Sequence, residues 1–244
     1  MLVEFQSVTK RYGSVRALDR VSLTLQPGQL VAVLGANGAG KTTFLRLLAG
    51  VAAPDSGEIH FDHEPMRRED LAQRQRFFFL PDFPALFLDE TVLRNLGLIL
   101  RLYGADRPGV EGQVVELLRD FDLLTLADAP VGTLSRGQIY KTALAALIAA
   151  DPELWLLDEP LASGMDPHGL TAFRRHVRDA VGRGRTVLYS TQVLDSVERF
   201  SDRVCLLHEG EVRAFATLEE LRQQSGGAND VLERLFAQLR EEPR

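Results

Sequence analysis

The chain has 244 residues, of which 45% are hydrophobic, so it holds enough apolar side chains to bury a sizeable core. Its formal net charge of -6 excludes a general basic field, and we therefore expect no nucleic-acid partner. The single cysteine, Cys205, excludes a disulfide framework within the chain, as is typical of cytoplasmic proteins. Because Cys205 lies in an apolar run, we predict a buried strand residue rather than a reactive thiol.

Two features bear on membranes. The N-terminal residues mix acidic, basic and apolar side chains, so we expect no export signal there. The longest charge-free apolar run, Thr142 to Ala150, is far shorter than the ~18 residues of a membrane span. If the protein works at a membrane, we therefore expect another chain to supply the spanning part.

The first part of the chain is predicted to be rich in strands. Alternating or continuous apolar residues next to Gly and Pro turns predict strands at Leu2–Val8, Val21–Leu25, Val31–Leu34 and Gly57–Phe61. A further apolar run covers Phe77–Leu80.

The pattern then changes to helical periodicity. Apolar spacing predicts helix from Thr91 to about Leu126, with a break between Gly104 and Gly109, and a further helix at Arg136–Ala150. We interpret this part as a helical lobe inserted into an α/β core.

The last third alternates between strands and helices. The predicted elements are the buried parallel strand Leu154–Leu157, the helix His168–Val181, the strand Thr186–Tyr189, the helix Val193–Phe200 and the strands Val204–Leu207 and Val212–Phe215. Near the C-terminus, after a loop at Ser225–Asp230, five apolar residues at helical spacing predict an amphipathic helix. They are Val231, Leu232, Leu235, Phe236 and Leu239.

The stretch VAVLGANGAGKTTFLRLLAG predicts a strand, a glycine loop and a helix. Gly35 and Gly40 occupy the fixed ends of the phosphate-binding loop pattern, and Lys41 and Thr42 follow them. Successive backbone N–H groups of such a loop point at a phosphate, and we expect a Cβ at Gly38 or Gly40 to obstruct them. Lys41 then reaches the β- and γ-phosphates, and the Thr42 hydroxyl binds Mg²⁺. The stretch therefore predicts nucleotide binding.

Two later motifs extend this interpretation. Leu154 to Glu159 reads LWLLDE, so a strand emerging from the core delivers Asp158 to the Mg²⁺ shell and places Glu159 to polarise an attacking water. Leu134 to Gln138 reads LSRGQ and precedes a helix, with Ser135 near its N-cap. Alone, the first motif is equally compatible with a strand that ends in two solvated acids, and the second with a simple capped helix.

The order of these motifs resembles the ATP-binding subunits of ABC transporters, whose signature is LSGGQ, over nearly the whole chain. The resemblance implies an α/β fold: a P-loop NTPase core of the ABC ATPase type, with an N-terminal antiparallel β subdomain and an inserted helical subdomain. It implies a single ABC ATPase domain over 1–244. Residues 1–83 and 151–216 then form the α/β core with its β subdomain, about 84–150 the helical lobe with the signature motif, and 217–244 the C-terminal helices.

The resemblance also implies Mg-ATP as the ligand and assigns the site residues. The nucleotide-binding residues are Tyr12, Gly35, Asn37, Gly38, Gly40, Lys41, Thr42, Thr43, Ser135, Gly137 and Gln138. The metal-binding residues are Thr42, Asp158 and Asp82, and the catalytic residues are Glu159, Gln192 and Asp82. Tyr12 corresponds to an aromatic that stacks on adenine, and an ordinary tyrosine at a strand end is the alternative.

The resemblance further implies two protein partners. In the family, Ser135, Gly137 and Gln138 of one chain close over the γ-phosphate bound to another, in a head-to-tail dimer of two copies or of two sister subunits. The stretch Ser163 to Asp166 resembles the D-loop, which bridges the two ATP-binding subunits. Opening and closing of the dimer drives a membrane-spanning permease subunit, which would place this chain at the cytoplasmic face of the cell membrane.

Two features concern the contact with the membrane subunit. Phe83 and Phe87 follow Asp82, next to the surface that receives that subunit in the family, so they are either partner contacts or core residues. The C-terminal amphipathic helix resembles the ending of subunits that serve small exporters of the ABC-2 type, although a helix docked on the core gives the same pattern. We therefore expect an exporter.

Three residues depart from the family's motifs. Arg136 replaces the first glycine of the signature pair, which is tolerable if its side chain points away from the phosphates. Asp82 replaces a glutamine that contacts Mg²⁺ and water, and its carboxylate adds negative charge beside the triphosphate. Gln192 replaces the switch histidine and cannot carry a positive charge. We therefore expect slow hydrolysis. The alternatives are a non-hydrolysing, ATP-gated interaction subunit and a soluble ABC ATPase not tied to a membrane.

Overall fold

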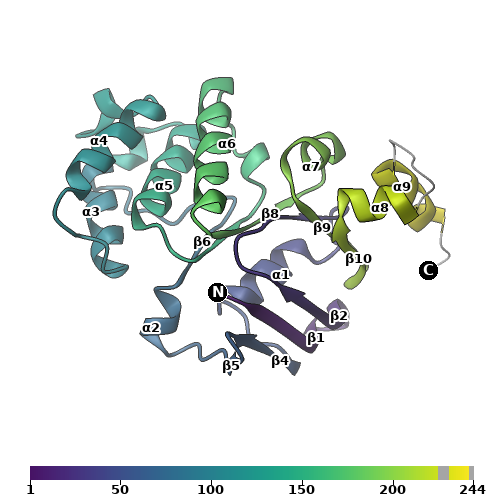
Figure 1. The fold of residues 1–244 in the computed structure, drawn as a ribbon. Helices are drawn as coiled ribbons and strands as arrows, with labels where there is room; N and C mark the ends of the chain where they lie inside the picture. The colour runs from purple at the N-terminus through teal and green to yellow at the C-terminus, as the bar shows by residue number, and fades with distance from the viewer. Residues whose placement is uncertain (225–230, 242–244) are drawn as a thin grey trace.

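The computed structural model describes residues 1–224 and 231–241, which form two β-sheets and the helices that pack on them (Figure 1). The first sheet is antiparallel, in the order β2-β1-β4-β5. Its strands are β1 (Val3–Tyr12), β2 (Val15–Leu25), β4 (Ser56–Phe61) and β5 (Glu64–Pro65). The second sheet has the order β10-β9-β3-β8-β7-β6, with β10 alone antiparallel to its neighbour. Its strands are β3 (Leu30–Leu34), β6 (Phe77–Leu80), β7 (Leu154–Leu157), β8 (Thr186–Thr191), β9 (Arg203–His208) and β10 (Glu211–Thr217).

The helices surround the second sheet, and three of them form the predicted insertion between β6 and β7 (Figure 1). The inserted helices are α3 (Val92–Leu102), α4 (Val110–Asp120) and α5 (Arg136–Ala150). The others are α1 (Lys41–Leu48), α2 (Leu71–Arg74), α6 (Pro167–Gly182), α7 (Leu194–Phe200), α8 (Leu218–Gln224) and α9 (Val231–Glu241). Within the part of the chain that the structure describes, none of the helices has the length and apolar character to cross a bilayer.

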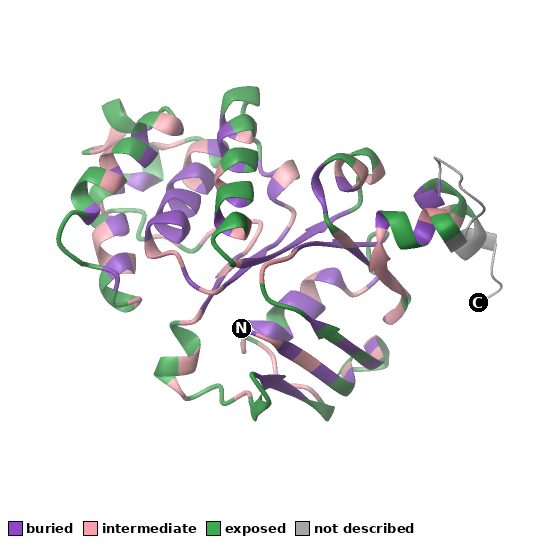
Figure 2. Cartoon of the chain, in the orientation of Figure 1, coloured by how far each residue is buried: buried purple, intermediate pink, exposed green. Residues whose placement is uncertain are grey.

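The second sheet is buried on both faces. Every residue of β3, β7 and β8 is buried, and Figure 2 shows this centre of the molecule in purple. Unbroken apolar strands are expected where both faces of a parallel sheet are covered. Successive residues of β3 point to opposite faces: Ala32 belongs to the core on the side of α6 and α7, whereas Val31 and Val33 belong to the core shared with α1 and the first sheet.

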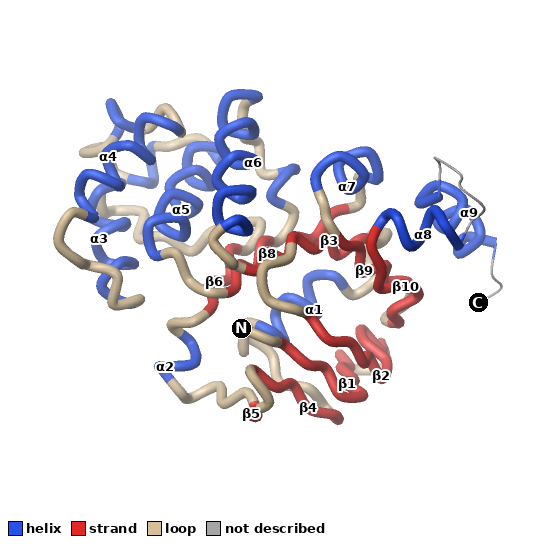
Figure 3. The backbone as a smooth tube through the Cα atoms, viewed as in Figure 1, coloured by secondary structure: helices blue, strands red, loops and turns tan. Residues whose placement is uncertain are grey.

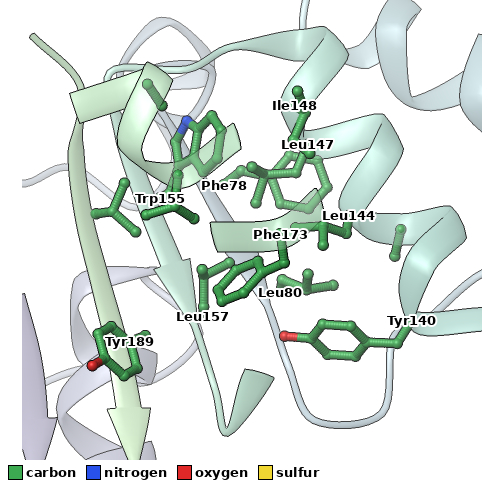
Figure 4. Close-up of a cluster of buried hydrophobic side chains, with 14 of the residues drawn as sticks. Phe78, Leu80, Tyr140, Leu144, Leu147, Ile148, Trp155, Leu157, Phe173 and Tyr189 are labelled. Carbon is green, nitrogen blue, oxygen red and sulfur yellow. The ribbon is translucent and has the colours of Figure 1, made fainter. Parts of the chain in front are cut away.

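The core on the helical side is built around α5, which is buried on nearly all sides (Figure 2). Burying one large apolar side chain contributes roughly 1.5–3 kcal/mol, so this cluster holds the inserted helices firmly on the sheet. Figure 4 shows its main members, which are Phe78, Leu80, Tyr140, Leu144, Leu147, Ile148, Trp155, Leu157, Phe173 and Tyr189.

The parallel strands β3, β6, β7 and β8 end at one edge of the second sheet (Figure 3). Leu34 at the end of β3 pairs with Thr191, and Leu80 at the end of β6 pairs with Leu157. Loops that follow neighbouring parallel strands converge at such an edge, where α/β proteins bind ligands. The residues that begin these loops are Gly35, Pro81, Asp158 and Gln192.

Most predicted elements are present, and the differences have local causes. The bounds of α5 and β7 coincide with the prediction. β1 and β2 are longer than the predicted Leu2–Val8 and Val21–Leu25. Ser7 and Arg20 adopt positive φ values where the strand register shifts, which interrupts the alternation on which the prediction depended.

Cys205 is fully buried in β9, as predicted, and burial raises the pKa of its thiol to about 12. At the C-terminus α9 begins at Val231, and Val231 and Leu232 pack into the core. The predicted loop Ser225–Asp230 and the side chain of Leu239 lie outside the described residues.

Candidate functional site

The loop that joins β3 to α1 has the backbone of a phosphate-binding loop. Gly38 and Gly40 have φ values of +84° and +107°, which a residue with a side chain rarely adopts. A Cβ on Gly40 would lie 2.4 Å from the carbonyl oxygen of Ala17, whereas one on Gly38 would meet nothing within 4 Å. The expectation that a Cβ would obstruct the backbone is therefore wrong for Gly38, which is required by its backbone conformation. Gly40 is required because a Cβ there would collide with β2.

Lys41 begins α1, and its ammonium group is turned back into this loop. Nζ donates to the carbonyl oxygen of Gly35 at 2.9 Å and to that of Ala36 at 3.3 Å. It also lies 3.3 Å from Oε1 of Glu159, and only 7% of the side chain is exposed. The first N–H groups of α1 face the same space. An ammonium group and free helix N–H groups are suited to binding phosphate oxygens.

Asp158 is buried directly after β7 and accepts two hydroxyl hydrogen bonds. Thr42 Oγ1 donates to its Oδ1 at 3.1 Å, and Ser190 Oγ donates to the same oxygen at 2.7 Å. The sheet thus brings together Thr42 and Asp158, which lie 116 positions apart in the sequence. A hydroxyl and a carboxylate are hard oxygen donors of the kind that Mg²⁺ prefers, so this pair fits the ion.

Glu159 has a strained backbone, with φ of 47° and ψ of 48°. A non-glycine residue in this left-handed region costs of order 1 kcal/mol, and such strain persists where surrounding contacts enforce it. Here the N–H of Glu159 donates to Ser190 Oγ at 2.8 Å, and the 3₁₀ turn Pro160–Ala162 follows at once. The side chain is directed toward Lys41 and remains 22% exposed, so water reaches the carboxylate.

The predicted signature residues form the capped start of α5, which matches the expected N-cap. Ser135 Oγ accepts from the N–H of Gln138 at 3.3 Å, and Gln138 Oε1 accepts from the N–H of Ser135 at 2.9 Å. A Cβ on Gly137 would lie 2.3 Å from the carbonyl oxygen of Gly164. Glycine at position 137 is therefore required by the close approach of the D-loop-like segment.

Three predicted site residues lie apart from this cluster. Asp82 follows β6, but its carboxylate pairs with Arg136. Gln192 follows β8 and is exposed. Tyr12 ends β1 with 48% of its surface exposed, and the Nζ of Lys10 lies 5.4 Å from its ring centroid. Two further predicted ligands lie in or after the phosphate-binding loop: Asn37, which is exposed, and Thr43, which is half-buried.

Two structural contacts at the site were missed by the sequence reasoning. Ser190 holds Asp158 and Glu159, but the predicted strand ended at Tyr189, one residue too early. Lys141 Nζ lies 2.6 Å from Oδ2 of Asp166, and its hydrogen bond lowers the pKa of that carboxyl. The sequence signal for this second contact was the position of Lys141 directly before the long apolar run of α5.

Comparison with known proteins adds to this geometry. The family model described as ABC transporter matches residues 18–162. The chain is 32% identical to the ABC-type transporter ATP-binding protein EcsA of Bacillus subtilis (strain 168), over 99% of this chain and 97% of that protein. It is 36% identical to Nod factor export ATP-binding protein I of Burkholderia orbicola (strain AU 1054), over 95% and 75% of the two chains. It is 37% identical to the daunorubicin resistance ATP-binding protein DrrA3 of Streptomyces coeruleorubidus, over 94% and 73%.

Solved structures give the same result. The structure of an ATP binding subunit of an ABC transporter superposes with a TM-score of 0.92 at 28% identity, and covers 99% of this chain and 100% of that one. CbiO1 from Clostridium perfringens, part of the ABC transporter complex cbiONQ, superposes with a TM-score of 0.74 at 25% identity, over 98% and 97% of the two chains.

The sheet order, the phosphate-binding loop and the inserted helices define an ATP-binding cassette of the P-loop type. The chain belongs to the ABC transporter family, as an ATP-binding subunit. Such subunits are generally ATPases and work with membrane permease components.

Proposed function

We propose that this chain hydrolyses Mg-ATP to power an ABC exporter. The observation that carries the proposal is the cluster at the edge of the second sheet, where Lys41 lies beside Glu159 and Thr42 beside Asp158. The direction of transport is supported by two relatives, one named for Nod factor export and one for daunorubicin resistance.

Each residue of the cluster has one role in this proposal. The loop N–H groups and Lys41 bind the phosphates, and Thr42 and Asp158 hold Mg²⁺, which supplies charge neutralisation to the phosphate oxygens when bound. Glu159 accepts a proton from the attacking water. Lys41 Nζ pairs with Glu159 at 3.3 Å. When the Lys41 ammonium group binds a phosphate oxygen instead, the Glu159 carboxylate is left free to act as a base.

We further propose a head-to-tail dimer with a second ATP-binding subunit. The start of α5, with Ser135, Gly137 and Gln138, then closes over the γ-phosphate bound to the other subunit, and Tyr12 stacks on adenine in its own chain. The proposal is supported by the exposure of Tyr12 and by the exposure of Ser135 at the capped start of α5. Both an identical copy and a sister subunit satisfy it.

An apolar groove supports the proposed contact with a permease. The groove has a volume of about 400 Å³ and lies beside the loop that follows β6. Phe83 and Phe87 on this loop are 70% and 62% exposed, so they are not core residues. The groove is lined by Val51, Phe79, Leu86, Ile99 and Tyr103, among others. We propose that an apolar helix of the permease docks here, which places the chain at the cytoplasmic face of the membrane.

We also propose that hydrolysis is slow. Loss of one charge-stabilising donor typically costs ~100- to 1,000-fold in rate, and a neutral donor retains part of this effect. Gln192 is such a neutral donor, and the carboxylate of Asp82 is turned to Arg136.

The experiment that tests the proposed function compares Mg-ATP hydrolysis by the purified chain and by its Glu159→Gln variant, with nucleotide binding measured separately on both. Hydrolysis that disappears in the variant, with binding retained, supports the proposal. Binding without hydrolysis in either protein favours the non-hydrolysing, ATP-gated subunit instead. Absence of the chain from the membrane fraction of the cells that naturally produce it favours an ABC ATPase not tied to a membrane.

A further inference from the structure

Two of the three residues that depart from the family's motifs meet in the structure. Arg136 Nη2 donates to Oδ1 of Asp82 at 2.5 Å, although the residues lie 54 positions apart in the sequence. The guanidinium also lies over the ring of Phe83, 4.5 Å from its centroid. Because Arg136 is the first residue of α5, these contacts join the loop after β6 to the signature motif.

The guanidinium has two partners on one loop. An isolated surface ion pair contributes little to stability, and the side chains of Arg136 and Asp82 are 47% and 32% exposed. Here, however, the charge-assisted hydrogen bond and the ring contact act on consecutive residues, Asp82 and Phe83. Together they hold this part of the loop in one position against α5.

A second observation concerns Tyr140, one helical turn beyond Arg136 and on the same face of α5. Tyr140 is fully buried, and its hydroxyl has no hydrogen-bond partner among residues 1–224 and 231–241. Figure 4 shows its ring extending from α5 toward Leu80 and Leu157, the last residues of β6 and β7. Since buried hydroxyls are normally hydrogen-bonded, this donor is available to a group that moves within reach.

The charges of three carboxylates act on the pKa of the Tyr140 hydroxyl. Burial, and then the charges of Asp158, Asp82 and Glu159, raise the pKa of Tyr140 well above its ordinary value, so the hydroxyl keeps its proton. Asp158 and Glu159 are already held by residues of the nucleotide site. Asp82 is held by Arg136, outside that site.

We propose that Arg136 is a positioning residue that holds the Asp82 carboxylate outside the nucleotide site. When Arg136 releases it, the Asp82 carboxylate reaches the Thr42–Asp158 pair. There the Tyr140 hydroxyl replaces Arg136 as the hydrogen-bond donor to Asp82. The inference rests on the proposed function, because Asp82 has this role only if the site binds Mg-ATP. Since Arg136 lies in the signature motif, a phosphate presented there by a second subunit competes with Asp82 for the guanidinium. The ion pair thus links the signature motif to the metal site of the same chain.

The test titrates Mg²⁺ against a fixed concentration of a fluorescent ATP analogue bound to the purified chain. Arg136→Gly frees Asp82 to join the metal ligands, so the Mg²⁺ concentration at half-saturation is expected to fall by about fivefold or more, the lower end of typical coupling between sites. Arg136→Lys keeps a cation and is expected to restore most of the wild-type dependence. The double variant with Asp82→Asn is expected to behave as Asp82→Asn alone.

Two results would overturn the proposal. One is an equal Mg²⁺ dependence of the wild type and Arg136→Gly, and the other is a shift in Arg136→Gly that persists when Asp82 is also replaced.

Tyr140→Phe removes only the hydroxyl. Combined with Arg136→Gly, it is expected to reverse part of the gain in apparent Mg²⁺ affinity; an unchanged gain contradicts the role given to Tyr140. If the wild-type chain binds no nucleotide, the proposed function fails, whereas nucleotide binding with an unaltered Mg²⁺ dependence rejects the positioning role alone.

Discussion

The hydroxyl of Ser190 lies 2.7 Å from Oδ1 of Asp158, and the same oxygen of Ser190 accepts the backbone N–H of Glu159 at 2.8 Å. One side chain on β8 therefore fixes two consecutive acidic residues at the end of β7. In the proposed mechanism these are a metal ligand and the base. Because Ser190 is fully buried, no bulk water replaces its hydroxyl when it is removed.

We expect Ser190→Ala to reduce ATP turnover by about 10- to 100-fold, the usual effect of removing a group that orients a metal ligand. The loss of the hydroxyl is also expected to lower the free energy of unfolding by roughly 1–3 kcal/mol, since the Glu159 N–H is left without its acceptor. Ser201→Ala is the matched control, because Ser201 Oγ bonds the Tyr189 hydroxyl at 2.7 Å on the far side of the same strand. The control is expected to lose stability but not turnover; equal loss of turnover in both variants would contradict a specific role for Ser190.

Replacement of Gln192 by histidine is expected to raise turnover. Gln192 is exposed after β8 and offers only a neutral hydrogen bond, whereas a protonated histidine supplies positive charge to the developing transition state. A rise of roughly tenfold is expected, since the glutamine already retains part of the effect. Steady-state hydrolysis at saturating Mg-ATP measures it, and Gln192→Ala is expected to fall below the wild type. No change, or a fall, in Gln192→His would reject the explanation of slow hydrolysis.

Gly137→Ala is expected to destabilise the chain and to abolish turnover. The added Cβ would lie 2.3 Å from the carbonyl oxygen of Gly164, so the start of α5 must move away from that segment. Gly112→Ala is the control, because a Cβ on Gly112, in the first turn of α4, meets nothing within 4 Å. There the substitution is expected to stabilise by up to about 1 kcal/mol. Urea unfolding and hydrolysis assays distinguish the two; a Gly137→Ala variant as active as the wild type would show that the close approach is dispensable.

Arg76 joins the two sheets electrostatically and is expected to make stability pH-dependent. It bonds both oxygens of Glu153, at 2.7 and 2.9 Å, and also Asp62. Its hydrogen bonds hold the pKa of Glu153 below the ordinary value. A lowered carboxyl pKa stabilises the fold above the unfolded-state pKa of about 4.3, and this contribution is lost as the pH falls through the lower folded-state value.

Arg76→Gln is therefore expected to lower the free energy of unfolding by about 1 kcal/mol at pH 7, since the pair is partly screened by solvent, and by much less at pH 3. Urea unfolding at the two pH values measures the difference. Arg119→Gln, which removes an exposed contact to Glu116 within α4, serves as the control and is expected to change stability little at either pH. A loss in Arg76→Gln that is independent of pH would indicate packing rather than charge.

The phosphate-binding loop and the strand before Asp158 could be predicted to within a residue, because their signals are local: glycine spacing in one case and an unbroken apolar run in the other. The ion pair of Arg136 with Asp82 could not be predicted, because it depends on how α5 lies against the end of β6. The role of Ser190 was hidden for a related reason. A polar residue at the end of an apolar run suggests the end of a strand, and only the pairing of Ser190 with Val33 of β3 shows that the strand continues through a buried position.

The close approach of Gly137 to Gly164 is one of two contacts that fasten the first turns of α5 to the segment before α6. The other is the hydrogen bond from Lys141 Nζ to Oδ2 of Asp166 at 2.6 Å. The Lys141 side chain also passes close to Gly169 in the first turn of α6, where a Cβ would lie 2.4 Å from its Cε. A displacement of the signature turn is therefore expected to move the segment from Ser163 to Asp166 as well. In the proposed dimer, nucleotide binding in one subunit would then act on the signature motif and on the Ser163–Asp166 segment of the other subunit together.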